Sequence, residues 1–73
     1  MNNKNIHNNI RKLRFNNGEM TQQDLADKIG VSRQTVIAIE SAKYSPSLEL
    51  AFRIANEFKV PLEEVFQYVS TKS

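Results

Sequence analysis

Apolar residues recur every three or four positions along most of the chain, which is the spacing of one face of an α-helix. Segments rich in polar residues, glycine or proline interrupt this pattern and divide the chain into separate amphipathic stretches. We expect five helices, at about residues 5–16, 21–29 and 32–40, then from residue 46 or 48 to 58, and at 61–66.

The second and third predicted helices are short and are joined by a tight turn. Thr21 is expected to cap the second helix, and Asp24, three residues later, completes a capping-box-like arrangement. Gly30 permits the left-handed backbone that ends this helix, and Ser32 offers a cap for the next one. These signals predict a helix-turn-helix at about residues 21–40.

The predicted fourth helix has a strong amphipathic pattern, but its start is ambiguous. Pro46 suits the first helical position after a Ser45 cap, while Ser47 could equally be the cap. We expect its inward face to consist of Leu48, Ala51, Ile54, Ala55 and Phe58.

The C-terminal segment changes periodicity. From Phe66 to Val69, aromatic or β-branched residues alternate with polar ones, which favours a short strand over a continued helix. Because a lone strand is not stable, it needs a partner, either residues 4–6 or another copy of the chain. We expect residues 71–73 to fray, and we interpret residues 1–73 as one domain with a possible dimerisation segment at 66–70.

Charge is distributed unevenly along the chain. Residues 1–43 carry seven Lys/Arg against four Asp/Glu, whereas residues 44–73 carry three against four, within a net charge of +2. The basic half contains the predicted helix-turn-helix, which favours an anionic partner over a purely solvated surface.

Composition excludes several other kinds of site. The chain has no cysteine, and its lone His7, which we expect to be an exposed helix residue, cannot build a metal site by itself. We find no nucleophile with a base and no phosphate-binding loop, so we predict neither an enzyme nor a cofactor. We also find no secretory signal or membrane span, and a cytoplasmic, nucleoid-associated location is the expectation.

Several short motifs in register make the chain resemble the lambda-repressor and Cro-like helix-turn-helix family, the XRE type. The shared motifs are Leu13-Arg14, Met20-Thr21-Gln22, Leu25-Ala26, Gly30-Val31-Ser32, Thr35-Val36, Ile39-Glu40, Lys43-Tyr44-Ser45-Pro46 and Leu48. The resemblance implies an all-α, compact five-helix DNA-binding domain. The chain's length is similar to that of stand-alone members such as the cytolysin-operon repressor type, which are homodimers that repress transcription from palindromic operators.

The start of the third helix is the predicted base-reading surface. Arg33, Gln34 and Thr35 cluster there, where side chains reach base edges in the major groove of double-stranded DNA. Ala38, one turn on, departs from relatives that carry a polar base-reading residue, and it could touch a thymine methyl group or make no contact.

Other residues are expected to hold the DNA backbone. The resemblance implies phosphate contacts by Gln22, Ser32, Lys43, Tyr44 and Ser45. The amino end of a helix favours such an anion at Gln22, although a helix-capping or exposed polar role is the alternative. For Tyr44 the alternative is packing against the fourth helix.

Two further sets of residues are interpreted as structural. The resemblance implies a partly buried ion pair between Arg14 and Glu40. We expect Arg14→Ala to loosen the third helix, which is the predicted recognition helix. A small domain does not easily bury all the apolar surface of Phe66, Tyr68 and Val69, so we predict that these residues form a homodimer interface. The alternative is that they pack on the first helix of their own chain.

The sequence therefore predicts a sequence-specific DNA-binding transcriptional regulator, a repressor that binds an inverted repeat as a homodimer. The alternative is an antitoxin-like or adaptor module that uses the same fold to bind another protein.

Overall fold

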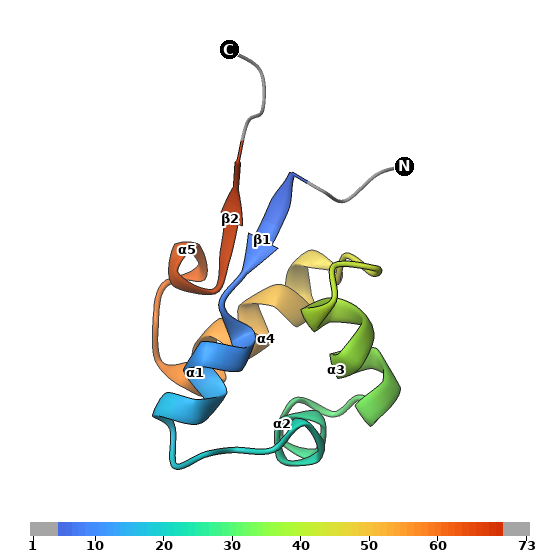
Figure 1. Cartoon of the computed structure of the whole chain (residues 1–73), viewed down its shortest axis with the longest axis vertical. Helices are drawn as coiled ribbons and strands as arrows, with labels where there is room; N and C mark the ends of the chain where they lie inside the picture. The colour runs from blue at the N-terminus through green and yellow to red at the C-terminus, as the bar shows by residue number, and fades with distance from the viewer. Residues whose placement is uncertain (1–4, 70–73) are drawn as a thin grey trace.

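A computed structural model describes residues 5–69 of the chain. It contains five helices and a two-stranded sheet, which confirms the predicted mainly helical class (Figure 1). In chain order the elements are β1 (Ile6–Asn8), α1 (Ile10–Asn16), α2 (Gln22–Ile29), α3 (Arg33–Glu40), α4 (Leu48–Phe58), α5 (Leu62–Val65) and β2 (Phe66–Tyr68). The expectations for Lys4, Ser70 and residues 71–73 lie outside the described residues.

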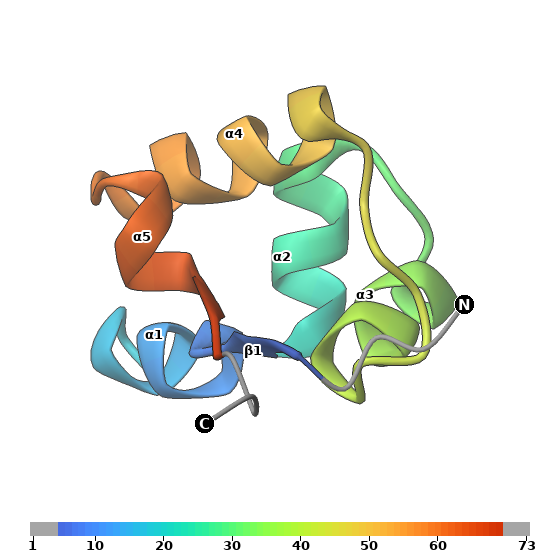
Figure 2. The same ribbon diagram turned by 90° about the horizontal axis from the view of Figure 1, so that it is seen from above.

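The helices surround one apolar core (Figure 2). Every helix contributes at least one buried side chain, and each fully buried aliphatic side chain stabilises the fold by roughly 1.5–3 kcal/mol. The buried apolar residues are Ile10, Leu25, Ala26, Ile29, Val36, Ile39, Ala51, Ile54, Ala55, Phe58 and Val65.

The boundaries of the helix-turn-helix follow the predicted capping signals. The Thr21 hydroxyl accepts a hydrogen bond from the Asp24 amide at 2.9 Å, and the Thr21 amide donates to the Asp24 carboxylate at 3.1 Å. Hydrogen bonds from the backbone and hydroxyl of Thr21 lower the pKa of Asp24 below its usual value. Gly30 ends α2 with φ +78°, and the Ser32 hydroxyl accepts from the Thr35 amide at 3.1 Å to begin α3.

The start of α4 is decided in favour of Ser47. Its hydroxyl accepts a hydrogen bond from the Leu50 amide at 3.1 Å, so Leu48 is the first helical residue. The prediction that Leu48 points inward is wrong, because this side chain is 69% exposed. It lies in the first turn of α4, next to the loop.

The predicted start of the first helix is also wrong. We expected this helix from about residue 5, but α1 begins at Ile10, and Ile6–Asn8 forms β1 instead. His7 is exposed as expected, but on a strand. Long-range pairing with β2 competes successfully here with the helical spacing of the apolar residues.

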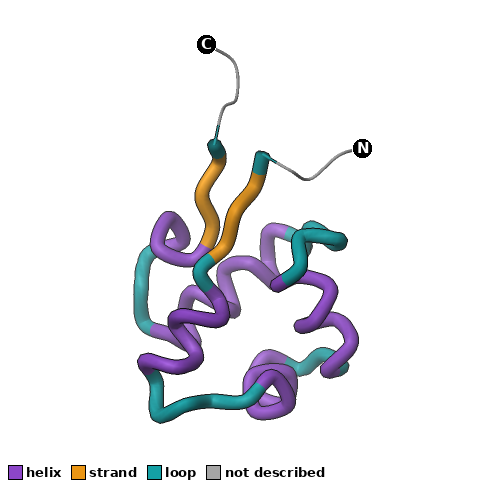
Figure 3. Tube along the Cα trace, in the orientation of Figure 1, coloured by secondary structure: helices purple, strands orange, loops and turns teal. Residues whose placement is uncertain are grey.

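The C-terminal strand is present and pairs within the chain. Strands β1 and β2 run antiparallel and lie side by side in Figure 3, with Ile6 opposite Tyr68 and Asn8 opposite Phe66. The Val69 amide extends the pairing by donating to the Asn5 carbonyl at 2.7 Å. Of the two partners considered for this strand, the N-terminal segment of the same chain is the one observed.

Candidate nucleic-acid interface

The exposed start of α3 presents the side chains predicted to read bases. Arg33 and Gln34 are exposed, and Thr35 and Ala38 are half-buried. The Thr35 hydroxyl lies 3.0 Å from the Ser32 hydroxyl, within hydrogen-bonding distance. Arg33 and Gln34 are therefore the most accessible groups at this end of the helix.

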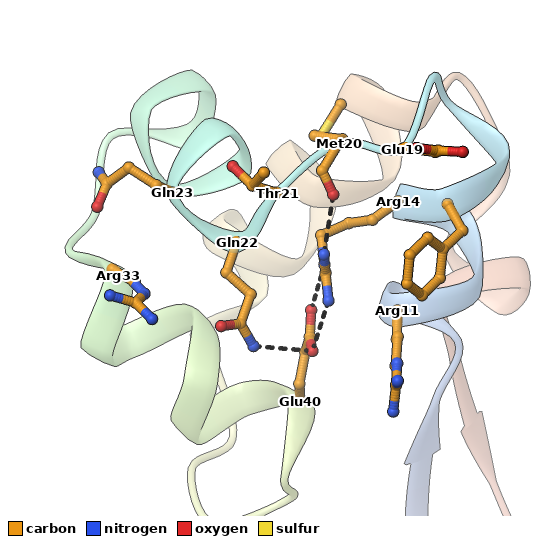
Figure 4. A pocket seen from close by; sticks show the side chains of 10 residues that line it. Arg11, Arg14, Glu19, Met20, Thr21, Gln22, Gln23, Arg33 and Glu40 are labelled. Carbon is orange, nitrogen blue, oxygen red and sulfur yellow. Dashed lines mark hydrogen bonds and ion pairs between the residues drawn. The ribbon is translucent and has the colours of Figure 1, made fainter.

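The opposite end of α3 is fixed by a polar cluster (Figure 4). Arg14 of α1 donates to the Glu40 carboxylate through Nε at 2.6 Å and Nη2 at 3.2 Å, and through Nη1 to the Met20 carbonyl at 2.8 Å. The Gln22 amide donates to the same Glu40 carboxylate at 3.2 Å. The ion pair expected between Arg14 and Glu40 is thus present and joins α1 to α3, and the Gln22 hydrogen bond adds α2 to the cluster.

The bond from Gln22 to Glu40 was not predicted. The sequence suggested a phosphate contact for Gln22, at the amino end of α2, or a helix-capping or exposed polar role. In the structure the side chain is half-buried and one N–H is directed to Glu40. An amide NH₂ carries a second hydrogen, so this bond leaves one donor.

A hollow in the surface lies beside this cluster, between α1 and the starts of α2 and α3. Its wall includes Arg11, Phe15, Gln23 and Arg33 (Figure 4). The Arg11 guanidinium lies 5.7 Å from the centre of the Phe15 ring, a cation–π arrangement that holds a positive charge at this rim. The arrangement places the Arg11 and Arg33 guanidinium groups, together with the Glu19 carboxylate, around the amino end of α2, which itself favours an anion.

The loop after α3 carries the other residues expected to contact phosphates. Lys43, Tyr44 and Ser45 are all exposed, with 47% of Tyr44 accessible, so Tyr44 is only partly packed. Ala42 precedes them with φ +63°, a left-handed conformation that turns the chain away from the end of α3. The loop thus offers a cation and two hydroxyl groups to solvent.

The residues expected at a dimer interface lie on the sheet, away from the start of α3 (Figure 1). Phe66 is half-buried against the core, whereas Tyr68 is 71% and Val69 is 41% exposed. Ile6 and Phe52 line the same apolar groove as Phe66 and Tyr68. The alternative, packing on the first helix, is not what the structure shows for the exposed Tyr68.

Two short helices joined by a glycine turn, with the start of the second exposed and cationic, define a helix-turn-helix of the DNA-binding class. Comparison with known proteins agrees. The family model described as helix-turn-helix matches residues 10–65. The chain belongs to this family, and its similarity to HTH-type transcriptional regulators identifies it as a DNA-binding regulator of transcription rather than an enzyme.

Individual relatives support the assignment. An uncharacterized HTH-type transcriptional regulator of Methanocaldococcus jannaschii is 63% identical over 49 residues, which are 67% of this chain and 74% of that protein. The cryptic phage CTXphi transcriptional repressor RstR of Vibrio cholerae is 36% identical over 56 residues, which are 77% of this chain and 50% of that protein.

A solved structure shows the same fold. The hypothetical transcription factor NHTF from Neisseria superposes with a TM-score of 0.70 at 28% identity, over 77% of this chain and 63% of that one. Within residues 5–69, no helix is long and apolar enough to cross a membrane.

Proposed function

We propose that this chain is a transcriptional repressor that binds an inverted-repeat operator as a homodimer. The observation that carries the proposal is the exposed pair Arg33 and Gln34 at the start of α3, a helix whose far end is fixed through Glu40. A rigidly held helix with a polar, accessible amino end suits insertion into the major groove.

Base reading in this proposal depends on the chemistry of two side chains. Arg33 donates two parallel hydrogen bonds to a guanine, and Gln34 pairs with an adenine, each contact contributing roughly 1–3 kcal/mol of discrimination. Thr35 and Ala38 lie further along the same helix, and the methyl group of each side chain suits contact with a thymine methyl group in the major groove.

Contacts to the DNA backbone in this proposal come from both sides of α3. Gln22 uses its remaining N–H at the amino end of α2, and Ser32 adds a hydroxyl group at the turn. Lys43, Tyr44 and Ser45 hold the phosphates beside the other end of α3. These contacts set the register of the protein on DNA and make its affinity depend on salt.

Residues 1–73 act in this proposal as a single DNA-binding domain whose dimerisation segment is 66–70, of which Ser70 lies outside the described residues. Tyr68 and Val69 supply exposed apolar surface, and Tyr68 lines an apolar groove together with Ile6, Phe52 and Phe66. Burying this surface against a second copy removes apolar area from water. Two recognition helices then lie roughly 34 Å apart, one helical turn of DNA.

Repression follows most simply from occupying the operator and excluding polymerase. One relative, RstR, is named a transcriptional repressor, and this name supports the sign of regulation proposed here.

Selection of bound sequences from a random duplex pool, at near-physiological salt, tests DNA recognition. We expect an enriched inverted repeat for the full chain, and Gln34→Ala to lose preference at one position of each half-site. Asn56→Ala, an exposed polar residue on α4, is the matched control and should select the original sequence. A folded chain that enriches no sequence would overturn the proposal in favour of the adaptor function.

Analytical ultracentrifugation tests the dimer. We expect the full chain to sediment as a dimer and a Tyr68→Ser, Val69→Ser variant to sediment as a monomer. Tyr44→Ser removes another exposed tyrosine from a different surface and should leave the dimer intact. If the double variant remains dimeric, the segment containing Tyr68 and Val69 does not form the dimer interface.

A further inference from the structure

Asn8 lies where the sheet, α1 and the recognition helix meet. It is the last residue of β1, opposite Phe66 of β2, and its side chain is half-buried. Its amide nitrogen donates to the carbonyls of Ile39 at 3.1 Å and Glu40 at 3.4 Å, the last two residues of α3. Its amide oxygen accepts from the Ile10 amide at 3.2 Å.

The contact with α3 meets a specific need of that helix. The last carbonyls of a helix lack partners within the helix and carry a partial negative charge. The Ile39 carbonyl accepts from the Ala42 amide of the following loop at 3.0 Å, and Asn8 adds a second donor to it and a donor to the Glu40 carbonyl. The last turn of α3 contains no basic residue, and the loop that follows leaves through Ala42 rather than a glycine. The Asn8 amide supplies donors to this end from a residue more than 30 positions away in sequence.

The second contact turns the chain. An asparagine oxygen that accepts from the amide two residues later forms an Asx turn, which ends an extended segment and begins a new direction. Here this turn separates β1 from α1. One side chain therefore turns the chain between β1 and α1 and also contacts the end of α3.

Glu40 is consequently held from two directions. Its carboxylate is bound by Arg14 and Gln22, and its carbonyl is bound by Asn8. The first set of contacts fixes α3 relative to α1 and α2. The Asn8 contact fixes it relative to the sheet.

We propose that Asn8 is a positioning residue that ties the sheet to the recognition helix and so sets the spacing between the two half-sites that the protein reads. This inference rests on the proposed function, in which the sheet carries the dimer interface and α3 reads DNA. Movement of α3 relative to the sheet within each subunit then changes the distance between the two recognition helices, but not the groups that each presents to its half-site.

Three variants separate this role from others. Asn8→Asp keeps an oxygen for the Ile10 amide but places a second acceptor, with a negative charge, against the Ile39 and Glu40 carbonyls. In Asn8→Ser the hydroxyl oxygen can still form the turn, but the serine side chain is too short to reach α3. This variant tests the same contact if Asn8→Asp fails to fold. Asn9→Ala is the matched control, because the exposed Asn9 amide donates to the Glu64 carbonyl, away from α3.

The first measurement needs no DNA. The amides of Ser41, Ala42 and Lys43 donate to carbonyls of α3 and report on the end of this helix. We expect their hydrogen exchange to become about tenfold faster in Asn8→Asp, from the loss of hydrogen bonds, with no such change in Asn9→Ala. Unchanged exchange in both Asn8 variants, or an equal change in Asn9→Ala, would overturn the positioning role.

The second measurement reads the spacing. In a selection with operators of varied spacer length, we expect the Asn8 variants to keep the half-site sequence and accept a wider range of spacers. A spacer preference as narrow as that of the unmodified chain would contradict the inference. A selection in which the unmodified chain enriches nothing refutes the proposed function instead, and it leaves the exchange result as the test of the Asn8 contact.

Discussion

Replacing Glu40 with glutamine tests whether the polar cluster under the recognition helix contributes to the fold. The side chains of Arg14 and Glu40 are only 9% and 11% exposed, and their closest atoms are 2.6 Å apart. Glu40→Gln keeps the shape of the side chain but removes its charge. The Arg14 guanidinium is then left buried with the Met20 carbonyl and one amide oxygen as partners.

The expected cost can be worked out from these contacts. Breaking a buried ion pair by removing one partner costs roughly 3–5 kcal/mol, because the other charge stays desolvated. In this variant Arg14 keeps its hydrogen bond to the Met20 carbonyl, and the glutamine oxygen accepts one further hydrogen bond from it. We therefore expect the free energy of unfolding to fall by about 2–3 kcal/mol, at or below the low end of that range. For a domain of this size the corresponding fall in Tm is roughly 10–20 °C.

The chain offers a matched control on α4. Glu49 pairs with Arg53 at 3.0 Å, but these side chains are 78% and 54% exposed. Such a pair contributes about 0.2–1 kcal/mol, so Glu49→Gln should barely change stability. Urea and thermal unfolding of the two variants, followed by circular dichroism at one pH and salt concentration, make the comparison. Equal stability of Glu40→Gln and Glu49→Gln would refute the reasoning.

A double variant separates stability from orientation. Arg14→Met with Glu40→Met replaces both charges by apolar groups, and such replacements of buried pairs are often neutral or stabilising. We therefore expect the double variant to unfold at a higher temperature than Glu40→Gln. If the pair orients α3, the same variant binds the selected operator more weakly; unchanged operator affinity would show that the pair does not orient the helix.

Three further predictions follow from single contacts. Ala42→Gly should raise the free energy of unfolding by about 0.5–1 kcal/mol, because glycine adopts φ +63° without strain; urea unfolding measures this, and no gain would contradict it. The pKa of Asp24 is lowered in the folded state, so its carboxylate stabilises the fold above the unfolded pKa, and this stabilisation is lost as the pH falls through the lower, folded pKa. The Asp24→Asn variant should therefore be less stable than the unmodified chain at pH 7 and should lose less stability below about pH 4. Urea unfolding at several pH values measures both effects. Lys43→Ala should weaken binding similarly for all sequences and reduce the slope of log affinity against log salt by about 1, measured by titration at several salt concentrations; a changed selected sequence would argue for base contact instead.

The helix-turn-helix could be predicted from local signals because these signals act over only a few residues. Thr21, Asp24, Gly30 and Ser32 each form the cap or turn that their side chains favour, and the apolar spacing between them selects the buried face. Neighbouring residues therefore contain most of the information that defines α2 and α3.

Errors arose where distant contacts outweigh local preference. Ile6 lies four residues before Ile10, a helical spacing, yet pairing with Tyr68 makes it part of a strand. Leu48 continues the apolar face of α4 in sequence, but the first turn of that helix leaves it 69% exposed. Periodicity indicates which face of a helix is apolar, but it does not show whether another element covers every turn of that face.

We infer that the formation and the orientation of α3 depend on different parts of the sequence. Its formation depends on Ser32 and the apolar spacing that follows, whereas its orientation depends on contacts that reach Glu40 from residues 18 to 32 positions away. A change in the first group should lower the stability of α3, whatever DNA it reads. Changes at Arg14, Gln22 or Asn8 that preserve the fold should instead alter how α3 is presented to DNA, so substitutions outside the reading surface are expected to change DNA recognition.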